Sequence, residues 1–230
     1  MNVAVAAARL EAPSAFVGCV STDANGDLIW RHLVSNGVDV RASRRADAPT
    51  ARAIIEHTPR LVFRFEGRGT ADTMLDAVDL APLGGGPHIL HGGTLGLFRG
   101  RTAETLAELV ERHDGLISLD PNIRPQIIDD RATWHHYHER WLARTHIYKA
   151  SDEDLEWIWP DRSAESSAAW LVETGVGAVV LTRGGDGLIV LTARSESIVA
   201  APEISVVDTV GAGDTIVATM LTSLLEHGVV

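Results

Sequence analysis

The sequence of 230 residues is poor in two reactive residue types, since it contains a single cysteine and a single lysine. Because Cys19 has no second cysteine to pair with, an internal disulfide is excluded, which suits a reducing compartment. The apolar surroundings of Cys19, AFVGCV, predict a small core residue rather than a nucleophile. Lys149 is the only lysine among 20 basic residues, so a catalytic lysine elsewhere in the chain is excluded.

Long apolar runs are also missing, and none approaches the roughly 18 residues needed to span a bilayer. The first residues, MNVAVAAARLEAPSA, carry no basic region, and Arg9 interrupts their apolar run, which argues against a signal peptide. The formal net charge of −11, with a pI near 5.3, repels nucleic acid and anionic membrane surfaces. We therefore expect a cytoplasmic protein that has no nucleic-acid or membrane partner.

Short apolar runs alternate with helical stretches along most of the chain. This order is typical of βαβ units and predicts an α/β fold, a doubly wound, mostly parallel sheet flanked by helices. Residues 50–67 differ, because two runs of alternating polarity predict a small β lid over approximately 38–68 of a single domain, 1–230. The predicted strands are 14–20, 87–91, 115–120, 145–149 and 177–183, and the predicted helices are 2–10, 23–37, 101–113, 131–143 and 164–174.

Polar or glycine-rich segments follow four of the predicted strands. They are HGGT (91–94), DPNIRP (120–125), KASDED (149–154) and TRGGDG (182–187). Ligands of such sheets bind at the carboxyl ends of the strands, so these segments predict one shared site. Within them Asn122 and Arg124 are the stronger ligand candidates, because an arginine can pair with phosphate in a planar, bidentate way.

The segment DTVGAGDT (208–215) places two glycines before a helix with an apolar stripe. Glycines let backbone N–H groups converge, and the helix N-terminus favours an anion. Asp214 lies at the helix start, where its carboxylate could take a proton from an attacking hydroxyl. The alternative is that Asp214 is an ordinary helix-start acid behind a tight turn.

DTVGAGDT closely resembles the second signature of the ribokinase-like sugar kinases, the PfkB family, which reads D-T-x-G-A-G-D. The stretches NVAVAAARLEAPSAFVGCV, DAPTARA, SLDPNIRP and YKASDEDL are similar to further family segments, so the resemblance covers essentially the whole chain. It implies a ribokinase-like fold and ATP-dependent phosphorylation of a sugar hydroxyl with Mg²⁺. A fructokinase-type substrate is the first expectation, and a 2-keto-3-deoxygluconate-type or ribose-type substrate is the alternative.

The resemblance also implies roles for individual residues. Asp214 would be the catalytic base, and Ser151 and Asp154 stand where many relatives carry N-x-x-E, which leaves Asp154 as the carboxylate for the metal. The remaining positions are Gly211, Ala212 and Gly213 in the anion hole, Asn2, Asn122 and Arg124 on the sugar, and Thr182, Gly184, Gly187 and Ser151 on the nucleotide.

The sequence departs from the family pattern in two places, and these departures suggest alternative functions. Relatives carry an aspartate-bearing strand and a Gly-Gly pair before the position of Asn2, and further elements of the adenine pocket after the signature helix, so the domain is expected to be incomplete. One alternative is therefore a fragment that binds ligand without turnover. A dehydrogenase would need G-x-G-x-x-G after the first strand, and the glycine clusters lack that spacing. Relatives often dimerise through the lid, so a homodimer is compatible with the sequence.

Overall fold

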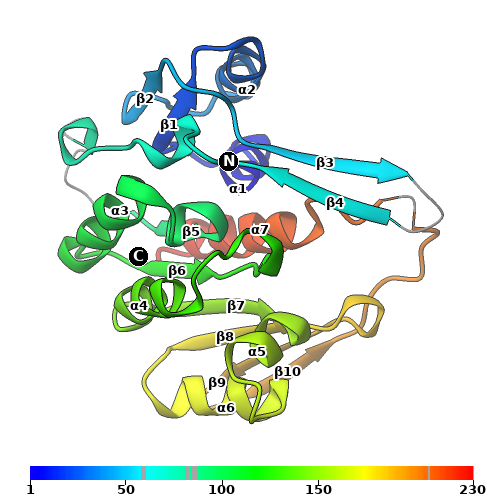
Figure 1. Ribbon diagram of the computed structural model, residues 1–230. Coiled ribbons are helices and arrows are strands. Elements are labelled where there is room, and N and C mark those ends of the chain that lie inside the picture. The colour runs from blue at the N-terminus through cyan, green and yellow to red at the C-terminus, as the bar shows by residue number, and fades with distance from the viewer. Residues whose placement is uncertain (58–60, 81–82, 84–87, 207, 230) are drawn as a thin grey trace.

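The computed structural model describes residues 1–57, 61–80, 83, 88–206 and 208–229, and of residues 55–57 and 61–64 it describes the backbone alone. A six-stranded sheet in the order β10-β9-β8-β7-β6-β5 runs through the molecule (Figure 1). Strands β5 to β8 are parallel neighbours, and β9 and β10 extend the sheet as antiparallel strands. The strands are β5 (Leu90–Gly93), β6 (Ile117–Asp120), β7 (Ile147–Ser151), β8 (Ala178–Thr182), β9 (Leu188–Thr192) and β10 (Glu196–Val199).

Helices pack on both faces of this sheet, which confirms the expected α/β class. Four helices build the large hydrophobic core on one face, and two others, the first and last of the chain, pack together on the opposite face. The first group comprises α3 (Gly100–Arg112), α4 (Arg131–Leu142), α5 (Asp152–Ile158) and α6 (Ala164–Glu173), and the second comprises α1 (Asn2–Arg9) and α7 (Ala212–Glu226).

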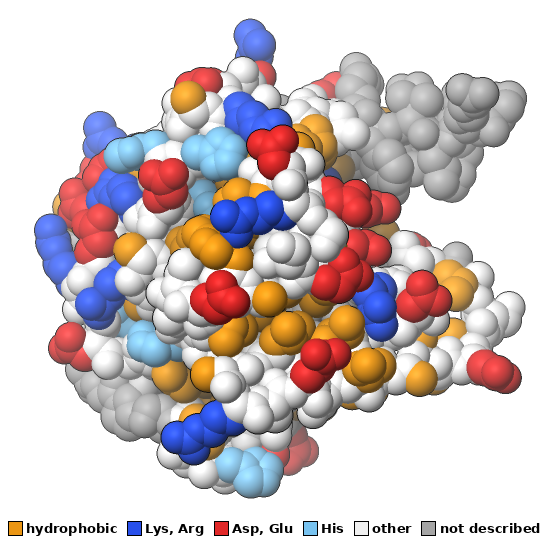
Figure 2. Space-filling view, turned by 90° about the horizontal axis from the view of Figure 1, so that it is seen from below, with side chains coloured by type: hydrophobic (Ala, Val, Ile, Leu, Met, Phe, Trp, Pro, Cys, Tyr) orange, Lys and Arg blue, Asp and Glu red, His pale blue; other side chains and the backbone are white. Residues whose placement is uncertain are grey.

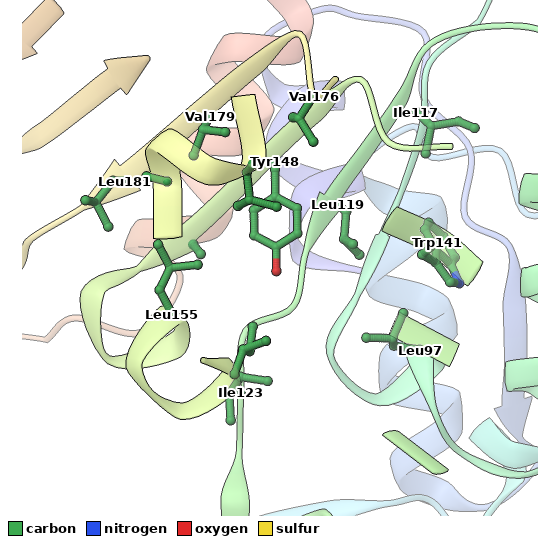
Figure 3. Close-up of a cluster of buried hydrophobic side chains, with 14 of the residues drawn as sticks. Leu97, Ile117, Leu119, Ile123, Trp141, Tyr148, Leu155, Val176, Val179 and Leu181 are labelled. Atoms are coloured by element: carbon green, nitrogen blue, oxygen red, sulfur yellow. The ribbon is translucent and has the colours of Figure 1, made fainter. Parts of the chain in front are cut away.

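The alternation of side chains along β7 separates the two faces. Tyr148 points into the large core, where it lies among leucine, isoleucine and tryptophan side chains (Figure 3). Ile147, its neighbour, packs with Val217 and Leu221 of α7 on the other face. Since successive residues of a strand point in opposite directions, Lys149 shares the α7 face with Ile147.

A second, two-stranded sheet is formed by β1 (Gly18–Ser21) and β2 (Ser43–Ala46), which run parallel with α2 (Ala24–Ser35) between them. A third sheet, β3 (Arg52–His57) with β4 (Leu61–Glu66), is an antiparallel pair that projects from the body (Figure 1). The stretch 38–68 therefore divides: β2 pairs with β1, and the projecting lid begins at β3. Residues 58–60, between the two lid strands, lie outside the described residues.

The base of the lid is fixed to the body by Arg99. Its guanidinium donates to the carboxylate of Asp72 and to the carbonyl oxygen of Gly67, and it lies 5.1 Å from the centre of the Phe65 ring. Charge pairing and ring contact together hold the lid strands beside the strand ends of the main sheet.

Two features were not predicted. Between β8 and β9 there is no room for a helix, so the apolar run 188–192 returns as an antiparallel hairpin strand. Helix α5 starts inside the segment that the sequence pattern presented as a ligand loop. Short 3₁₀ turns connect other elements: η1 (Ala71–Thr73), η2 (Ala77–Leu80), η3 (Thr94–Leu97), η4 (Pro125–Ile127) and η5 (Gly184–Asp186).

Among the described residues, no helix combines the length and the apolar character needed to cross a membrane. The surface seen from below in Figure 2 intersperses acidic, basic and apolar side chains. The acidic excess of the sequence is thus distributed among basic side chains on this face.

Candidate active site

The four polar segments predicted to form a site all follow strands of the main sheet. Strands β5, β6, β7 and β8 are adjacent and parallel, so their carboxyl ends, and the segments after them, meet at one edge. The lid strand β4 contacts η4 in the segment after β6, so the lid reaches this same edge. The sheet topology thereby confirms the predicted shared edge.

Asp214 lies in the first turn of α7 and is partly buried. Its Oδ2 accepts a hydrogen bond of 2.9 Å from Nδ2 of Asn2, the first residue of α1. The contact brings together two residues that are 212 positions apart in the sequence, both predicted for the site. Because the bond engages Oδ2, the second carboxylate oxygen, Oδ1, is the one available to an incoming hydroxyl.

The turn before Asp214 has the conformation that its glycines permit. Gly211 caps α7 in the left-handed region, with φ of 84°, which is unfavourable for residues with a Cβ. The N–H of Ala212 donates to the carbonyl oxygen of Thr209 at 3.2 Å, so this amide of the predicted anion hole already has a partner. Helix geometry leaves the next N–H groups, of Gly213 and Asp214, without intrahelical acceptors and directed out of the helix start.

A buried ion pair lies directly beneath this turn. Nζ of Lys149 is 3.0 Å from Oδ2 of Asp120, and each side chain is only 7% exposed. A Cβ added to Gly213 would lie 2.9 Å from the same Nζ, so the ammonium packs against the second residue of α7. Burial raises the pKa of Asp120 to about 6 although Lys149 opposes the shift, and Oδ1 of Asp120 is buried without a hydrogen-bond partner in the described parts of the chain.

His91, the second residue of β5, is a further polar residue on the face of the sheet that α7 covers. Its Nδ1 lies 3.1 Å from Oγ of Ser118, two residues before Asp120 on the same side of β6. Burial lowers the pKa of His91 to about 4, with Asp214 opposing this shift and Lys149 adding to it. The imidazole is therefore neutral at neutral pH and serves as a hydrogen-bonding group rather than as a cation.

Asn122 and Arg124 lie after β6, close to the lid. Nδ2 of Asn122 donates to Oγ1 of Thr94 at 3.0 Å, which ties the segments after β5 and β6 together. Both residues have positive φ, 41° for Asn122 and 52° for Thr94, an uncommon conformation for residues with side chains. The exposed Arg124 donates to the carbonyl oxygen of Ile123 at 2.7 Å.

Ser151 and Asp154 form the N-terminal cap of α5. Oγ of Ser151 accepts the N–H of Asp154 at 3.1 Å, and Oδ2 of Asp154 accepts the N–H of Ser151 at 3.0 Å. Oδ1 of Asp154 accepts the N–H of Ile123 at 2.7 Å, so this buried carboxylate joins α5 to the segment after β6. Ser151 is the register partner of Thr182 on β8, which places these two predicted nucleotide residues side by side.

The turn between β8 and β9 holds the remaining nucleotide candidates. Gly187 has φ of 87°, and a Cβ there would lie 2.0 Å from the carbonyl oxygen of Val199, so only glycine fits. Gly184 has φ of 52° and faces open space. Immediately before Gly184, Nε of Arg183 is buried and has no hydrogen-bond partner in the part of the chain that the structure describes.

A hollow of about 590 Å³ lies at the base of the lid. Its lining combines lid residues, among them Arg52 and Arg68, with Asp23 and Thr50 of the β1–β2 unit. Asp23 accepts hydrogen bonds from both the N–H and the hydroxyl of Thr50, which holds the pKa of its carboxyl well below the usual range. The hollow adjoins the lid rather than the turn before Asp214.

The described residues suit a phosphate group better than a dedicated metal cage. The glycine turn, the helix start and Lys149 beneath it form a cradle that a Cβ on Gly213 would disturb. In contrast, no group of three or more His, Cys, Asp or Glu residues in the described parts of the chain could hold a metal ion. Both oxygens of Asp154 already accept backbone N–H groups. A magnesium ion at this edge would accordingly be held largely by phosphate oxygens and water.

The ion pair was the part of the site that sequence reasoning missed. In the sequence Asp120 is one residue of the polar segment 120–125, and Lys149 is distinguished only as the sole lysine. The signal is present in the sequence, because the two residues end consecutive predicted strands, 115–120 and 145–149, and have opposite charges. What the sequence could not show is that both side chains point to the face covered by α7.

Comparisons with known proteins agree with this architecture. The family model described as pfkB family carbohydrate kinase matches residues 1–229. A fructokinase of Rhizobium leguminosarum bv. trifolii is 34% identical over 226 residues, which cover 97% of this chain and 69% of that protein.

Two solved structures are similar in fold over nearly the whole chain. The fructokinase of Vibrio cholerae O395, in a form with fructose, ADP and calcium ion bound, superposes with a TM-score of 0.85 at 28% identity, covering 97% of this chain and 74% of that one. Aminoimidazole riboside kinase of Salmonella enterica, complexed with aminoimidazole riboside and an ATP analogue, gives the same TM-score, 0.85, with 28% identity and coverages of 97% and 74%.

Proposed function

Since the chain belongs to the pfkB family of carbohydrate kinases, we propose that it transfers the γ-phosphoryl group of ATP to a hydroxyl of fructose or a closely similar sugar. The observation that carries the proposal is Asp214 at the start of α7, held by Asn2 and preceded by the glycine turn. Support for a ketose substrate comes from the fructokinase relatives, one of which was solved with fructose and ADP. We keep ribose, 2-keto-3-deoxygluconate and aminoimidazole riboside as substrates to be tested beside it.

The roles of the residues follow from their positions. Asn2 orients the Asp214 carboxylate through Oδ2, and Oδ1 then takes the proton of the acceptor hydroxyl as that oxygen attacks. The N–H groups at the start of α7 stabilise negative charge where the phosphoryl group passes, since the helix N-terminus favours anions. Asp214 and the amides act on different atoms, so a carboxylate within an anion-binding turn is consistent with both tasks.

The remaining predicted residues belong to the same proposal. Asn122 and Arg124 would contact the sugar from the segment under the lid, and Thr182, Gly184, Gly187 and Ser151 would line the nucleotide beside β8. A bound magnesium ion would supply neutralisation of the phosphate charge. Asp154 would serve it by fixing the segment after β6 and by its negative charge, because its oxygens are occupied by backbone N–H groups.

The test is a coupled ADP-release assay of the chain against the panel of sugars, with Asp214→Asn as the variant. Loss of the base should lower kcat by about 10²- to 10⁴-fold, with sugar binding measured by calorimetry retained. Asp27→Asn is the matched control, because Asp27 is also an acid in the first turn of a helix but is exposed and paired with Arg45. Its kcat should equal that of the wild type.

Two results would contradict the proposal in different ways. Wild-type turnover by Asp214→Asn would remove the base assignment. A folded wild-type chain that releases no ADP with any sugar, yet binds sugar or nucleotide, would favour the alternative of binding without turnover.

A further inference from the structure

The buried Lys149–Asp120 pair has no task in the proposed reaction so far. Burying two opposite charges removes both from water, and their attraction offsets that loss only when geometry and hydrogen bonding are complete. Here they are incomplete, because Oδ1 of Asp120 is buried without a partner among the described residues. Replacing a buried pair by well-packed uncharged side chains of similar volume is often neutral for stability, so such a pair is weak evidence of a purely structural role.

The position of the ammonium is unfavourable unless negative charge is present. The N-terminus of a helix carries a partial positive charge of about half a unit. Lys149 nevertheless places a full positive charge against Gly213, the second residue of α7. The ammonium therefore adds to the positive potential at the start of α7 instead of neutralising it.

Charged groups of both signs lie around this ammonium. The N-terminal amino group of Met1, whose pKa is lowered by burial, is near enough to influence both His91 and Asp214. Asp120 contacts it at 3.0 Å, and Asp214 is near enough to influence the charge of Asp120, as is Asp154. His91 is the further titratable side chain of this face, and burial keeps it neutral at neutral pH. The Lys149 ammonium is thus a fixed positive charge next to the start of α7. The proposed function requires negative charge to develop at this same place during phosphoryl transfer.

We propose that Lys149, held in place by Asp120, is a positioning residue for phosphoryl transfer. Its ammonium supports the Gly211–Asp214 turn from within the protein and adds fixed positive charge beneath the amides that receive the phosphoryl group. It acts through the turn and through its field, while Asp214 remains the base. This inference rests on the proposed function, and it adds a residue that the D-T-x-G-A-G-D segment does not contain.

The test compares single and double neutral variants. Lys149→Met and Asp120→Asn each leave one buried group without its partner, so each should lower stability. The double variant leaves no unpaired charge and should regain the melting temperature of the wild type. If the pair serves only the fold, kcat returns with stability. If Lys149 positions the turn and supplies positive charge to it, kcat of the stable double variant remains about 10- to 100-fold below that of the wild type, while KM for the sugar is unchanged.

A binding measurement adds a readout that does not depend on turnover. The double variant should bind a nonhydrolysable ATP analogue about tenfold more weakly than the wild type, with ADP binding unchanged, because of the two charges removed the ammonium is the one that packs against Gly213. The control is a neutralised surface pair, Arg112→Met with Glu108→Gln, whose 3.3 Å contact is exposed and lies on α3, on the face of the sheet opposite α7. This control should alter neither kcat nor nucleotide binding.

The outcomes separate this inference from the proposed function. A double variant with wild-type kcat and unchanged affinity for the ATP analogue, in a chain that phosphorylates sugar, overturns the role of Lys149 alone. A wild-type chain that neither binds nucleotide nor phosphorylates any sugar overturns both.

Discussion

Tyr148 and Lys149 are consecutive residues of β7, both buried, and they show two ways in which a protein keeps a polar group inside. Tyr148 points to the face covered by α4 to α6, where its hydroxyl meets Nε2 of His138 at 2.8 Å and its ring lies in the apolar cluster of Figure 3. Lys149 points to the face covered by α7, where it forms an ion pair with Asp120, a carboxylate whose Oδ1 has no hydrogen-bond partner among the residues that the structure describes.

The difference lies in how completely the polar atoms are satisfied. Burial lowers the pKa of His138 to about 3 and raises that of Tyr148 well above its usual value, so both groups stay neutral and share one hydrogen bond between the hydroxyl and Nε2. Trp134 stacks on His138 with ring centres 4.6 Å apart, which fixes the imidazole further. A neutral group whose hydrogen bond is made within the protein stabilises the fold. A charged pair in which one carboxylate oxygen makes no such bond can still accept a hydrogen bond from a group outside the chain.

Among the variants that test this contrast between the two faces of β7, Gly213→Ala should have the largest effect on kcat. A Cβ at residue 213 would meet Nζ of Lys149 at 2.9 Å, so the ammonium or the turn must move. We expect kcat to fall about 10- to 100-fold through disturbance of the charge beneath the amides. Alanine is a better helix former than glycine by about 1 kcal/mol, so stability should not fall in parallel.

The measurements for Gly213→Ala are kcat in the ADP-release assay and thermal unfolding. Thr219→Ala, on the exposed side of the same helix, is the control for helix propensity and should leave kcat unchanged. Full activity of Gly213→Ala would show that the contact with Lys149 has no catalytic consequence.

A smaller effect, on the opposite face, is expected from Tyr148→Phe. The variant keeps the ring but leaves Nε2 of the buried His138 without its hydrogen-bond partner, which should lower the free energy of unfolding by about 1–2 kcal/mol. Urea denaturation gives this value, and kcat of the folded protein should match the wild type. A fall in kcat without a fall in stability would mean that the two faces of β7 are not functionally separate.

The smallest effect is a pH dependence assigned to His138. Its pKa of about 3 in the folded protein lies below the ordinary 6.5, so on acidification the unfolded chain gains a proton that the folded chain refuses. Stability is therefore lost as the pH falls below about 6.5, by roughly 0.7 kcal/mol between pH 7 and pH 6.

His138→Gln isolates this contribution. The variant is expected to be less stable than the wild type at pH 7, and the difference between the two should narrow at pH 6, because only the wild type carries the imidazole. Urea denaturation at both pH values measures the difference. A difference that stays constant would place the titration elsewhere, for example at His135, which is the nearest charged influence on His138.

The parallel strands of the main sheet and the shared edge of the site were predictable because they follow from local patterns. Apolar runs predicted β6, β7 and β8, and the rule that ligands meet at the carboxyl ends of parallel strands placed Asn122 and Ser151 at one edge. Helix α5 was missed although the pattern that starts it, Ser151 followed by Asp154 three positions later, is a capping box. The same residues suited a ligand loop, and only the fold decided between the two.

The contact between Asn2 and Asp214 and the pairing of Lys149 with Asp120 could not be derived from local pattern. Both join residues on different elements, and each depends on which face a side chain takes. The roles of these residues remain predictions that the experiments above can test.

The burial of the one lysine also determines how the net charge of the protein changes at alkaline pH. With Lys149 enclosed in the protein, the basic side chains at the surface belong to arginine and histidine. Arginine keeps its proton far above the range in which lysine loses its own, and histidine has already lost its proton there. Between about pH 9 and pH 11 the net charge should stay nearly constant, and with it the electrophoretic mobility, where lysine-rich proteins become steadily more negative.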